Sequence, residues 1–240
     1  VEGFGHAPGG GLREGSAFKS TRAAAEAATR GVAKAFNMTE AAALALHEVE
    51  LDERGPVAIA RFAQRAHGLE IFRSNLAVAI SKRGLEPVAA SGLLATSLTG
   101  SERAFQRTTL SAARTAYMTG ARMTGLPASA TTPLLALGAL DDYERFAADG
   151  LKVPARAKRV FFPITSEGQT TLEPAHYVEL QWKSGAARSV VVSAQDGRVL
   201  FDNDLVKYDY TYRVYADPAA TGAPLGQVEL LETLLDAGVD

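Results

Sequence analysis

A helical pattern followed by a run of alternating strands occurs twice in this chain of 240 residues. The first helix is predicted to begin at Ser16 or Ser20 and to end at Phe36, because alanine dominates this stretch and Ser20 can cap the first free backbone N–H groups. The second is predicted over residues 101–123, where apolar residues return at helical spacing. Each helix precedes short segments with strand-like alternation. We therefore expect an α+β fold of two modules, each an antiparallel sheet packed with one or more helices.

The strands are predicted from alternation and from turn residues. In the first block His67-Gly68 predicts a tight turn, because glycine readily adopts a positive φ. In the second block Gln195-Asp196-Gly197 predicts a hairpin. Between the blocks, LLALGALDDYERFAADG predicts a shorter helix that ends at Gly150. The expected strands lie in residues 43–51, 57–64, 69–74, 75–81, 85–92, 159–165, 172–182, 187–194 and 197–201.

Composition and spacing divide the chain into four segments. A glycine-rich arm spans residues 1–15, the two modules span 16–97 and 98–205, and a C-terminal strand with a junction tail spans 206–240. The tail carries tyrosines at alternate positions, which places them on one face of a strand. That face is either packed inside the protein or a partner surface, where tyrosine is enriched. These tyrosines are Tyr208, Tyr210, Tyr212 and Tyr215.

Composition excludes several classes of protein. The chain contains no cysteine, which excludes disulfide scaffolds, cysteine-based metal sites and thiol catalysis. A net charge of −2 gives no electrostatic footprint for nucleic acid. No apolar run approaches the roughly 20 residues that a membrane-spanning helix needs. With 47% apolar residues the chain can bury a core without staples.

Catalytic motifs are missing from the sequence. Neither a nucleophile elbow, a phosphate-binding loop nor a dinucleotide fingerprint occurs. His47-Glu48-Val49-Glu50 lacks the second histidine that a zinc helix needs four residues later. The other histidines have no neighbours at ligand spacing. We therefore expect no enzyme activity and no metal or cofactor in this chain.

Two ordered sets of motifs carry a family resemblance. ARFAQRAHGLEIFRSNLAVAIS and LEPVAASG resemble the fungalysin/thermolysin propeptide module. The second block resembles the PepSY-like module, of cystatin-like fold, that follows it in fungalysin precursors, through RAKRVFFP, LEPAHYVEL, VVSAQDGRVLFDNDL and YTYRVYADP. Together they cover about residues 16–222 and resemble the propeptide region of a fungalysin-like, myxobacterial-type zinc metalloprotease. The matched positions in the first module are Gln64, Gly68, Phe72, Leu76, Val78, Val88, Ser91 and Gly92.

The resemblance implies a propeptide that helps a secreted zinc metalloprotease to fold and then blocks its cleft. It implies a secreted, extracellular or periplasmic location, and a partner catalytic domain bound in cis or as a cleaved complex. Zinc would belong to that partner, since no H-E-x-x-H motif occurs here. Gln64, Arg65 and Gly68 belong either to a structural turn or to the interface. The candidate partner-binding residues are Gln64, Arg65, Tyr212, Arg213, Tyr215 and Asp217.

The chain departs from the family pattern at its C-terminal end. After YRVYADP the family runs through a junction into the catalytic domain, whereas this chain continues with APLGQVELLETLLDAGVD. We expect either a piece of a longer precursor or a stand-alone relative, and the start at Val1 fits a processed or partial chain. The alternative function is a stand-alone extracellular structural protein that assembles through the edge of residues 206–215.

Overall fold

A computed structural model describes residues 18–125, 133–166, 169–206, 214–216 and 226–228. The chain separates into two units between Leu205 and Val206. The larger unit holds a ten-stranded mixed sheet packed against helices, and this confirms the predicted α+β class. The division into four segments stays a prediction. Among the described residues, the helices are too short or too polar to cross a membrane.

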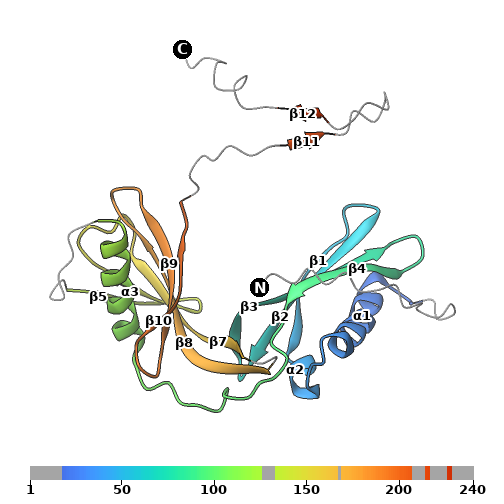
Figure 1. Cartoon of the computed structure of the whole chain (residues 1–240), viewed down its shortest axis with the longest axis horizontal. Helices are drawn as coiled ribbons and strands as arrows, with labels where there is room; N and C mark the ends of the chain where they lie inside the picture. Colours follow the sequence, from blue (N-terminus) through green and yellow to red (C-terminus); the bar gives the residue numbers. More distant parts are fainter. Residues whose placement is uncertain (1–17, 126–132, 167–168, 207–213, 217–225, 229–240) are drawn as a thin grey trace. The chain divides into compact units, whose positions relative to one another are not determined.

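The first part of the larger unit matches the predicted helix followed by strands (Figure 1). The side chain of Ser20 accepts a hydrogen bond of 3.2 Å from the backbone N–H of Ala23, so the predicted helix start is confirmed. A short second helix replaces the beginning of the predicted 43–51 strand. The elements are α1 (Thr21–Ala35), α2 (Glu40–Leu44), β1 (Leu46–Asp52), β2 (Val57–Ala66), β3 (Leu69–Ser81) and β4 (Glu86–Leu93).

Helix α1 covers one face of these four strands, and we call this assembly the α1 layer. Ala24 and Ala25 of the helix pack on the apolar residues that point toward it, namely Ala58, Ala60, Phe62, Leu76, Val78 and Ile80. Successive side chains of a strand point to opposite sides. The other side of the sheet therefore presents partly or fully exposed side chains, most of them uncharged. This outer face includes Ile59, Ala63, Ala77, Ala79, Ala89 and Ser91, and also the ion-paired Arg61, which lies opposite Ala77.

The turn between β2 and β3 has the predicted form. His67 and Gly68 have φ values of 49° and 78°, and Ala66 pairs with Leu69 across the turn. Two positive φ angles in a two-residue loop match the twist of a hairpin. Strand β3 is continuous, whereas the sequence predicted a break after residue 74. The backbone explains the apparent break, because Arg73 has a φ of 55° and the alternation changes phase there.

Helix α3 (Thr109–Met123) begins eight residues later than predicted. The preceding residues form turns, in which the N–H of Ser101 donates to the carbonyl of Leu98 at 3.0 Å. The cap is Thr108, whose hydroxyl accepts a hydrogen bond of 3.2 Å from the N–H of Ser111. The prediction of a helix from residue 101 is therefore wrong, although its C-terminal end at residue 123 is confirmed.

The predicted helix that ends at Gly150 is also wrong. The segment forms a hairpin of β5 (Leu135–Leu140) and β6 (Tyr143–Ala147). Gly138 has a φ of 84° and Asp141 a φ of 53°, which a right-handed helix does not accept. Asp141 makes the turn, and the fully buried Phe146 anchors β6.

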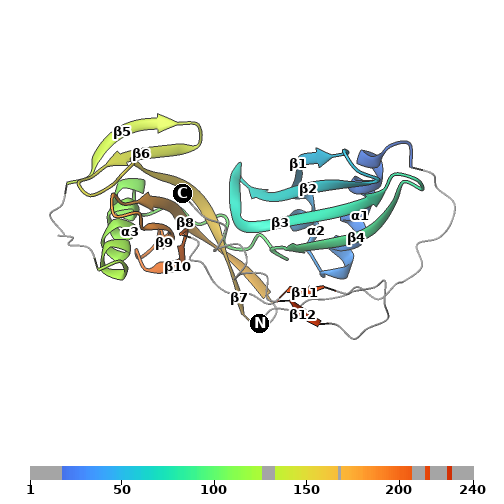
Figure 2. The same cartoon turned by 90° about the horizontal axis from the view of Figure 1, so that it is seen from above.

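The last strands form the predicted meander, including the hairpin turn at Gly197, where φ is 81° (Figure 2). Helix α3 packs across them, and we call α3 with β6–β10 the α3 layer. Its core includes Tyr117, Leu180 and Trp182. A Cβ on Gly120 would lie 2.3 Å from the Trp182 ring, so only glycine allows this helix to approach so closely. The strands are β7 (Ala155–Ser166), β8 (Gln169–Gln181), β9 (Ala187–Ser193) and β10 (Val199–Asp204).

Strands β3 and β7 join the two layers into one sheet. They run parallel and share the pair Ile71–Phe161. An ion pair of 2.6 Å between Lys158 Nζ and Glu70 Oε2 lies beside this pair. The joint is otherwise apolar, since Ile71 and Phe161 belong to one buried cluster with Leu172.

The smaller unit contains β11 (Val214–Ala216) and β12 (Gly226–Val228), which pair antiparallel. Only the C-terminal end of the strand predicted in the tail therefore lies within the described residues. Tyr208, Tyr210 and Tyr212 lie outside the described residues.

Candidate functional site

Gln64 is the first of the predicted partner-binding residues, and its side chain is completely buried in the α1 layer. Its amide nitrogen donates to the carbonyls of Ala42 at 2.9 Å and Ala95 at 3.1 Å. Its amide oxygen accepts from the N–H of Ala95 at 2.8 Å and from the hydroxyl of Ser74. The side chain ties α2, β3 and the segment after β4 to β2. With no exposed atom left for a partner, Gln64 belongs to the framework of the fold.

Arg65 projects from the opposite side of the same strand and is exposed. Its guanidinium approaches Asp142 Oδ2, in the β5–β6 turn, at 3.8 Å. Both side chains are open to solvent, so this contact is weak. A partner contact for Arg65 stays a prediction.

The remaining predicted contact residues belong to the C-terminal tail. Tyr215 lies in β11, where its backbone is paired with Gln227 of β12. Tyr212, Arg213 and Asp217 lie outside the described residues. The structure therefore does not bring the six predicted residues together in one described site.

The described histidines have different surroundings and different degrees of exposure. His47 is exposed on β1, and His67 Nε2 lies 3.2 Å from the Ser101 hydroxyl. Within the described part of the chain, no group of three or more potential metal ligands occurs. His6 lies outside that part.

His176 is fully buried on β8, as a strand residue of the predicted second block. Neither ring nitrogen has a hydrogen-bond partner, and the ring packs edge-on against Phe105 at 5.6 Å between centroids. Burial, and then the positive charge of Arg159 on β7, lower the pKa of His176 to about 4. The imidazole is therefore neutral near pH 7, and its place in the core gives it no access to a substrate.

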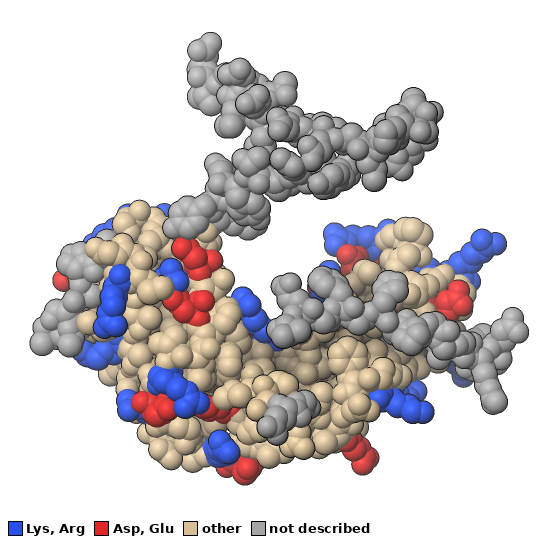
Figure 3. Space-filling view, viewed as in Figure 1, with Lys and Arg blue, Asp and Glu red and all other residues tan. Residues whose placement is uncertain are grey.

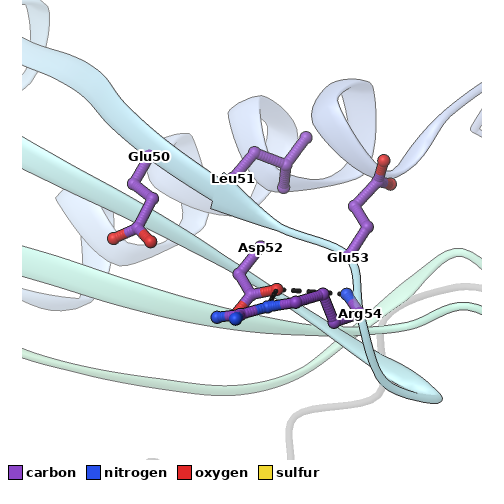
Figure 4. A pocket seen from close by; sticks show the side chains of 5 residues that line it. All are labelled: Glu50, Leu51, Asp52, Glu53 and Arg54. Atoms are coloured by element: carbon purple, nitrogen blue, oxygen red, sulfur yellow. Dashed lines mark hydrogen bonds and ion pairs between the residues drawn. The ribbon is translucent and has the colours of Figure 1, made fainter.

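A surface hollow lies at the end of β1 and the turn that follows (Figure 4). Its charged groups satisfy one another: the guanidinium of Arg54 donates to Asp52 at 2.7 and 2.9 Å. Hydrogen bonds from the Arg54 side chain and N–H lower the pKa of Asp52 below its usual range. Glu50 pairs with Arg61 at 2.9 Å. Among the described residues that line it, the hollow therefore presents no group of unpaired side chains that could bind a ligand. It is part of the local turn structure.

A second hollow, of about 240 Å³, is lined by aromatic residues and one arginine where β3 meets β7. The Phe72 ring lies 5.8 Å from Phe162 and 5.3 Å from Phe201. The Arg73 guanidinium lies over the Phe201 ring at 4.3 Å. We call this site the Phe–Arg pocket, and it consists of Phe72, Arg73, Ser74, Leu93, Leu94, Ala95, Phe162, Pro163, Thr165 and Phe201.

The sequence did not identify the Phe–Arg pocket. Phe72 was matched as a motif position of the first module, but its aromatic neighbours come from β7 and β10, about 90 and 130 residues away along the chain. The available sequence signal was the interrupted alternation of apolar and polar residues at Phe72-Arg73. There the side chains of β3 change the face of the sheet to which they point.

Comparison with known proteins does not assign the chain to a family. No known protein family matches the chain, and no curated protein matches it. Among solved structures, the chain is similar to the Bacillus megaterium YpeB C-terminal domain. The identity is 11%, the match covers 80% of this chain and 68% of that one, and the TM-score is 0.32. A TM-score this low does not define a shared fold.

Proposed function

We propose that the chain is a propeptide-type module, which assists the folding of a secreted zinc metalloprotease and inhibits it by covering its cleft. The zinc belongs to the partner, and the module works outside the cytoplasm. The proposal rests first on the ordered motifs that resemble the fungalysin propeptide region. Its finer details, including the PepSY-like character of the α3 layer, come from that resemblance alone.

The observation that supports a protein-binding role is the outer face of the α1 layer. Most of its side chains are uncharged, and its Arg61 is ion-paired with Glu50 at 2.9 Å. Three small residues, Ala63, Ala77 and Ala79, are only partly buried. Small side chains allow another protein surface to approach the sheet closely. Figure 3 shows charged side chains scattered over the viewed surface, with wide uncharged areas between them. A surface of this kind suits a protein partner better than a nucleic acid.

Stabilisation of the partner follows from simple mass action. A module that binds the folded protease and not the unfolded one shifts the partner's folding equilibrium toward the native state. The same contact excludes substrate when it covers the cleft.

The test uses refolding and inhibition of thermolysin-type and fungalysin-type zinc proteases in the presence of the full chain. We expect a higher yield of active enzyme on refolding and, at equimolar chain, inhibition of the folded enzyme. Ala79→Glu places a charge on the outer face, opposite the uncharged Ile59 and Ala89, and is expected to weaken inhibition at least tenfold. Arg83→Glu, in the exposed β3–β4 turn, is the matched control and should inhibit normally. Unchanged refolding and activity for every protease tested would reject the proposal.

A specific feature favours self-assembly as the second candidate function. Among the described strands β4 pairs with β3 alone, and its residues from Val88 to Leu93 are exposed and uncharged. Uncharged exposed edges favour pairing between molecules. Light scattering over a hundredfold range of concentration distinguishes the two functions, because an assembling protein grows in mass whereas an inhibitor stays at the mass of one chain.

A further inference from the structure

The edge of strand β4 is open and unprotected. Among the described strands, β4 pairs with β3 alone, so its other side presents unpaired backbone N–H and C=O groups. Every residue from Val88 to Leu93 is exposed and none is charged. The register with β3 is regular from Ala89 to Leu93. This stretch is a straight template for one more strand.

The other edges of the sheet carry features that discourage pairing. Strand β1 carries Glu48, Glu50 and Asp52, and β10 carries Asp202 and Asp204. Charged side chains on an edge oppose the approach of another strand.

The uncharged edge of β5 has a different protection. Its register shifts between Ala136 and Gly138, and Gly138 has a φ of 84°. An irregularity of this kind twists the edge away from a flat partner. Among the described edges, the Ala89–Leu93 stretch is therefore the one with neither charge nor bulge.

The open edge leads directly into the Phe–Arg pocket. Leu93, the last residue of β4, lines the pocket and is 71% exposed. Aromatic rings form the walls, and Arg73 supplies a cation at the rim. No ion pair joins Arg73 to another of the described residues. The pocket thus combines a largely apolar lining with a guanidinium that is paired with no carboxylate from the described part of the chain.

The backbone at Arg73 adds a second observation. Its φ of 55° is a left-handed conformation that an arginine side chain disfavours, and glycine or asparagine would adopt it more easily. The guanidinium of this residue lies at the pocket, over the Phe201 ring. Strained backbone that fixes a side chain in place is typical of ligand sites.

We propose that the β4 edge and the Phe–Arg pocket together bind an extended peptide segment of a partner protein. The segment adds a strand to Ala89–Leu93, inserts an aromatic side chain into the pocket, and places a neighbouring carboxylate on Arg73. Aromatic walls select the anchor, and charge complementarity selects the acidic neighbour. This site goes beyond the proposed function, because it requires an extended acidic–aromatic segment and not a protease.

The first experiment measures binding of a fluorescein-labelled peptide, Thr-Val-Thr-Val-Phe-Asp-Thr-Val, to the full chain by fluorescence anisotropy. Two further peptides carry N-methyl groups on alternate amides, in the two opposite registers. An added strand uses the N–H groups of every second residue. We expect one methylated peptide to bind at least tenfold more weakly and the other within twofold of the parent. No binding, or equal binding of both methylated peptides, would overturn the proposal.

The second experiment tests the pocket with substitutions. Arg73→Gln is expected to weaken binding of the aspartate peptide about tenfold and to leave a matched asparagine peptide unchanged. Arg73→Gly relieves the strained φ and is expected to raise the melting temperature while weakening binding equally, which separates a ligand role from a structural one. Arg83→Gln is the matched surface control and should bind normally.

Two outcomes would overturn the assignment of the occupant. Equal loss with both peptides would show that Arg73 does not contact a carboxylate. Light scattering that shows a dimer, disrupted by the peptide, would make a second copy of this chain the occupant of the edge. Both outcomes leave the protease assay unaffected, so the proposed function is tested independently.

Discussion

The α1 and α3 layers both place one helix across antiparallel strands, but they bury polar side chains in different ways. In the α1 layer the buried amide of Gln64 has partners for both its nitrogen and its oxygen. In the α3 layer the buried ring nitrogens of His176 and the indole nitrogen of Trp182 have no hydrogen-bond partner. Buried polar groups without partners reduce stability, whereas satisfied groups fix the chain in one arrangement.

The apolar cores of the two layers differ in the size of the side chains packed between helix and sheet. Helix α1 meets its sheet through alanines, and the largest side chain of that cluster is Phe62. Helix α3 contributes Tyr117 to one cluster with Phe146 and Trp182 of the sheet region. The α1 layer thus depends on a hydrogen-bonded connection for its specificity, and the α3 layer depends on large apolar surfaces and tolerates polar atoms without partners. Substitutions of the buried polar residues and at the helix–sheet contacts test this contrast between the two layers.

The largest effect is expected for Gln64→Leu in the α1 layer. Leucine fills much of the volume but leaves the carbonyls of Ala42 and Ala95 without their donor, while the N–H of Ala95 keeps only the Ser74 hydroxyl as an acceptor. Each buried orphan group costs about 1–3 kcal/mol, so the free energy of unfolding should fall by about 4 kcal/mol. Urea unfolding followed by circular dichroism measures the change.

The matched control is Arg65→Leu, the next residue on the same strand, which is exposed. It should change the unfolding free energy by less than about 0.5 kcal/mol. If Gln64→Leu unfolds at the same urea concentration as the control, the hydrogen-bonded connection does not determine the stability of the α1 layer.

A smaller effect, dependent on pH, is expected from His176 in the α3 layer. Its pKa is about 4 in the folded chain and near 6.5 when unfolded, so between these values the unfolded chain binds the extra proton. The free energy of unfolding therefore decreases as the pH falls from about 6.5 to 4, by about 3 kcal/mol in total.

His176→Leu removes the titrating group and should flatten this part of the stability profile, measured by urea unfolding at several pH values. His47→Leu, on an exposed position of β1, should leave the slope unchanged. An identical slope for the His176→Leu variant would show that the buried imidazole does not control acid stability.

The sequence predicted this difference between the α1 and α3 layers only in part. The motif containing Gln64 and Gly68 was recognised, but the role of Gln64 depends on Ala42 and Ala95, which lie 22 and 31 residues away along the chain. Alternation of apolar and polar residues predicted strands such as β2, because one face of that strand is buried. It failed at LALGAL, where every residue of the strand is exposed and no face is selected by burial. The pocket around Arg73 escaped for the same reason as the Gln64 connection, since long-range contacts create it.

The smallest effect compares two helical glycines, one in each layer. A Cβ on Gly120 of α3 would lie 2.3 Å from the buried Trp182 ring, whereas a Cβ on Gly31 of α1 meets nothing within 4 Å. Gly120→Ala should lower the unfolding free energy by about 2 kcal/mol through overpacking. Gly31→Ala should raise it by up to about 1 kcal/mol through helix propensity. Thermal unfolding measures both changes, and equal stabilisation by the two alanines would show that α3 does not need close contact with Trp182.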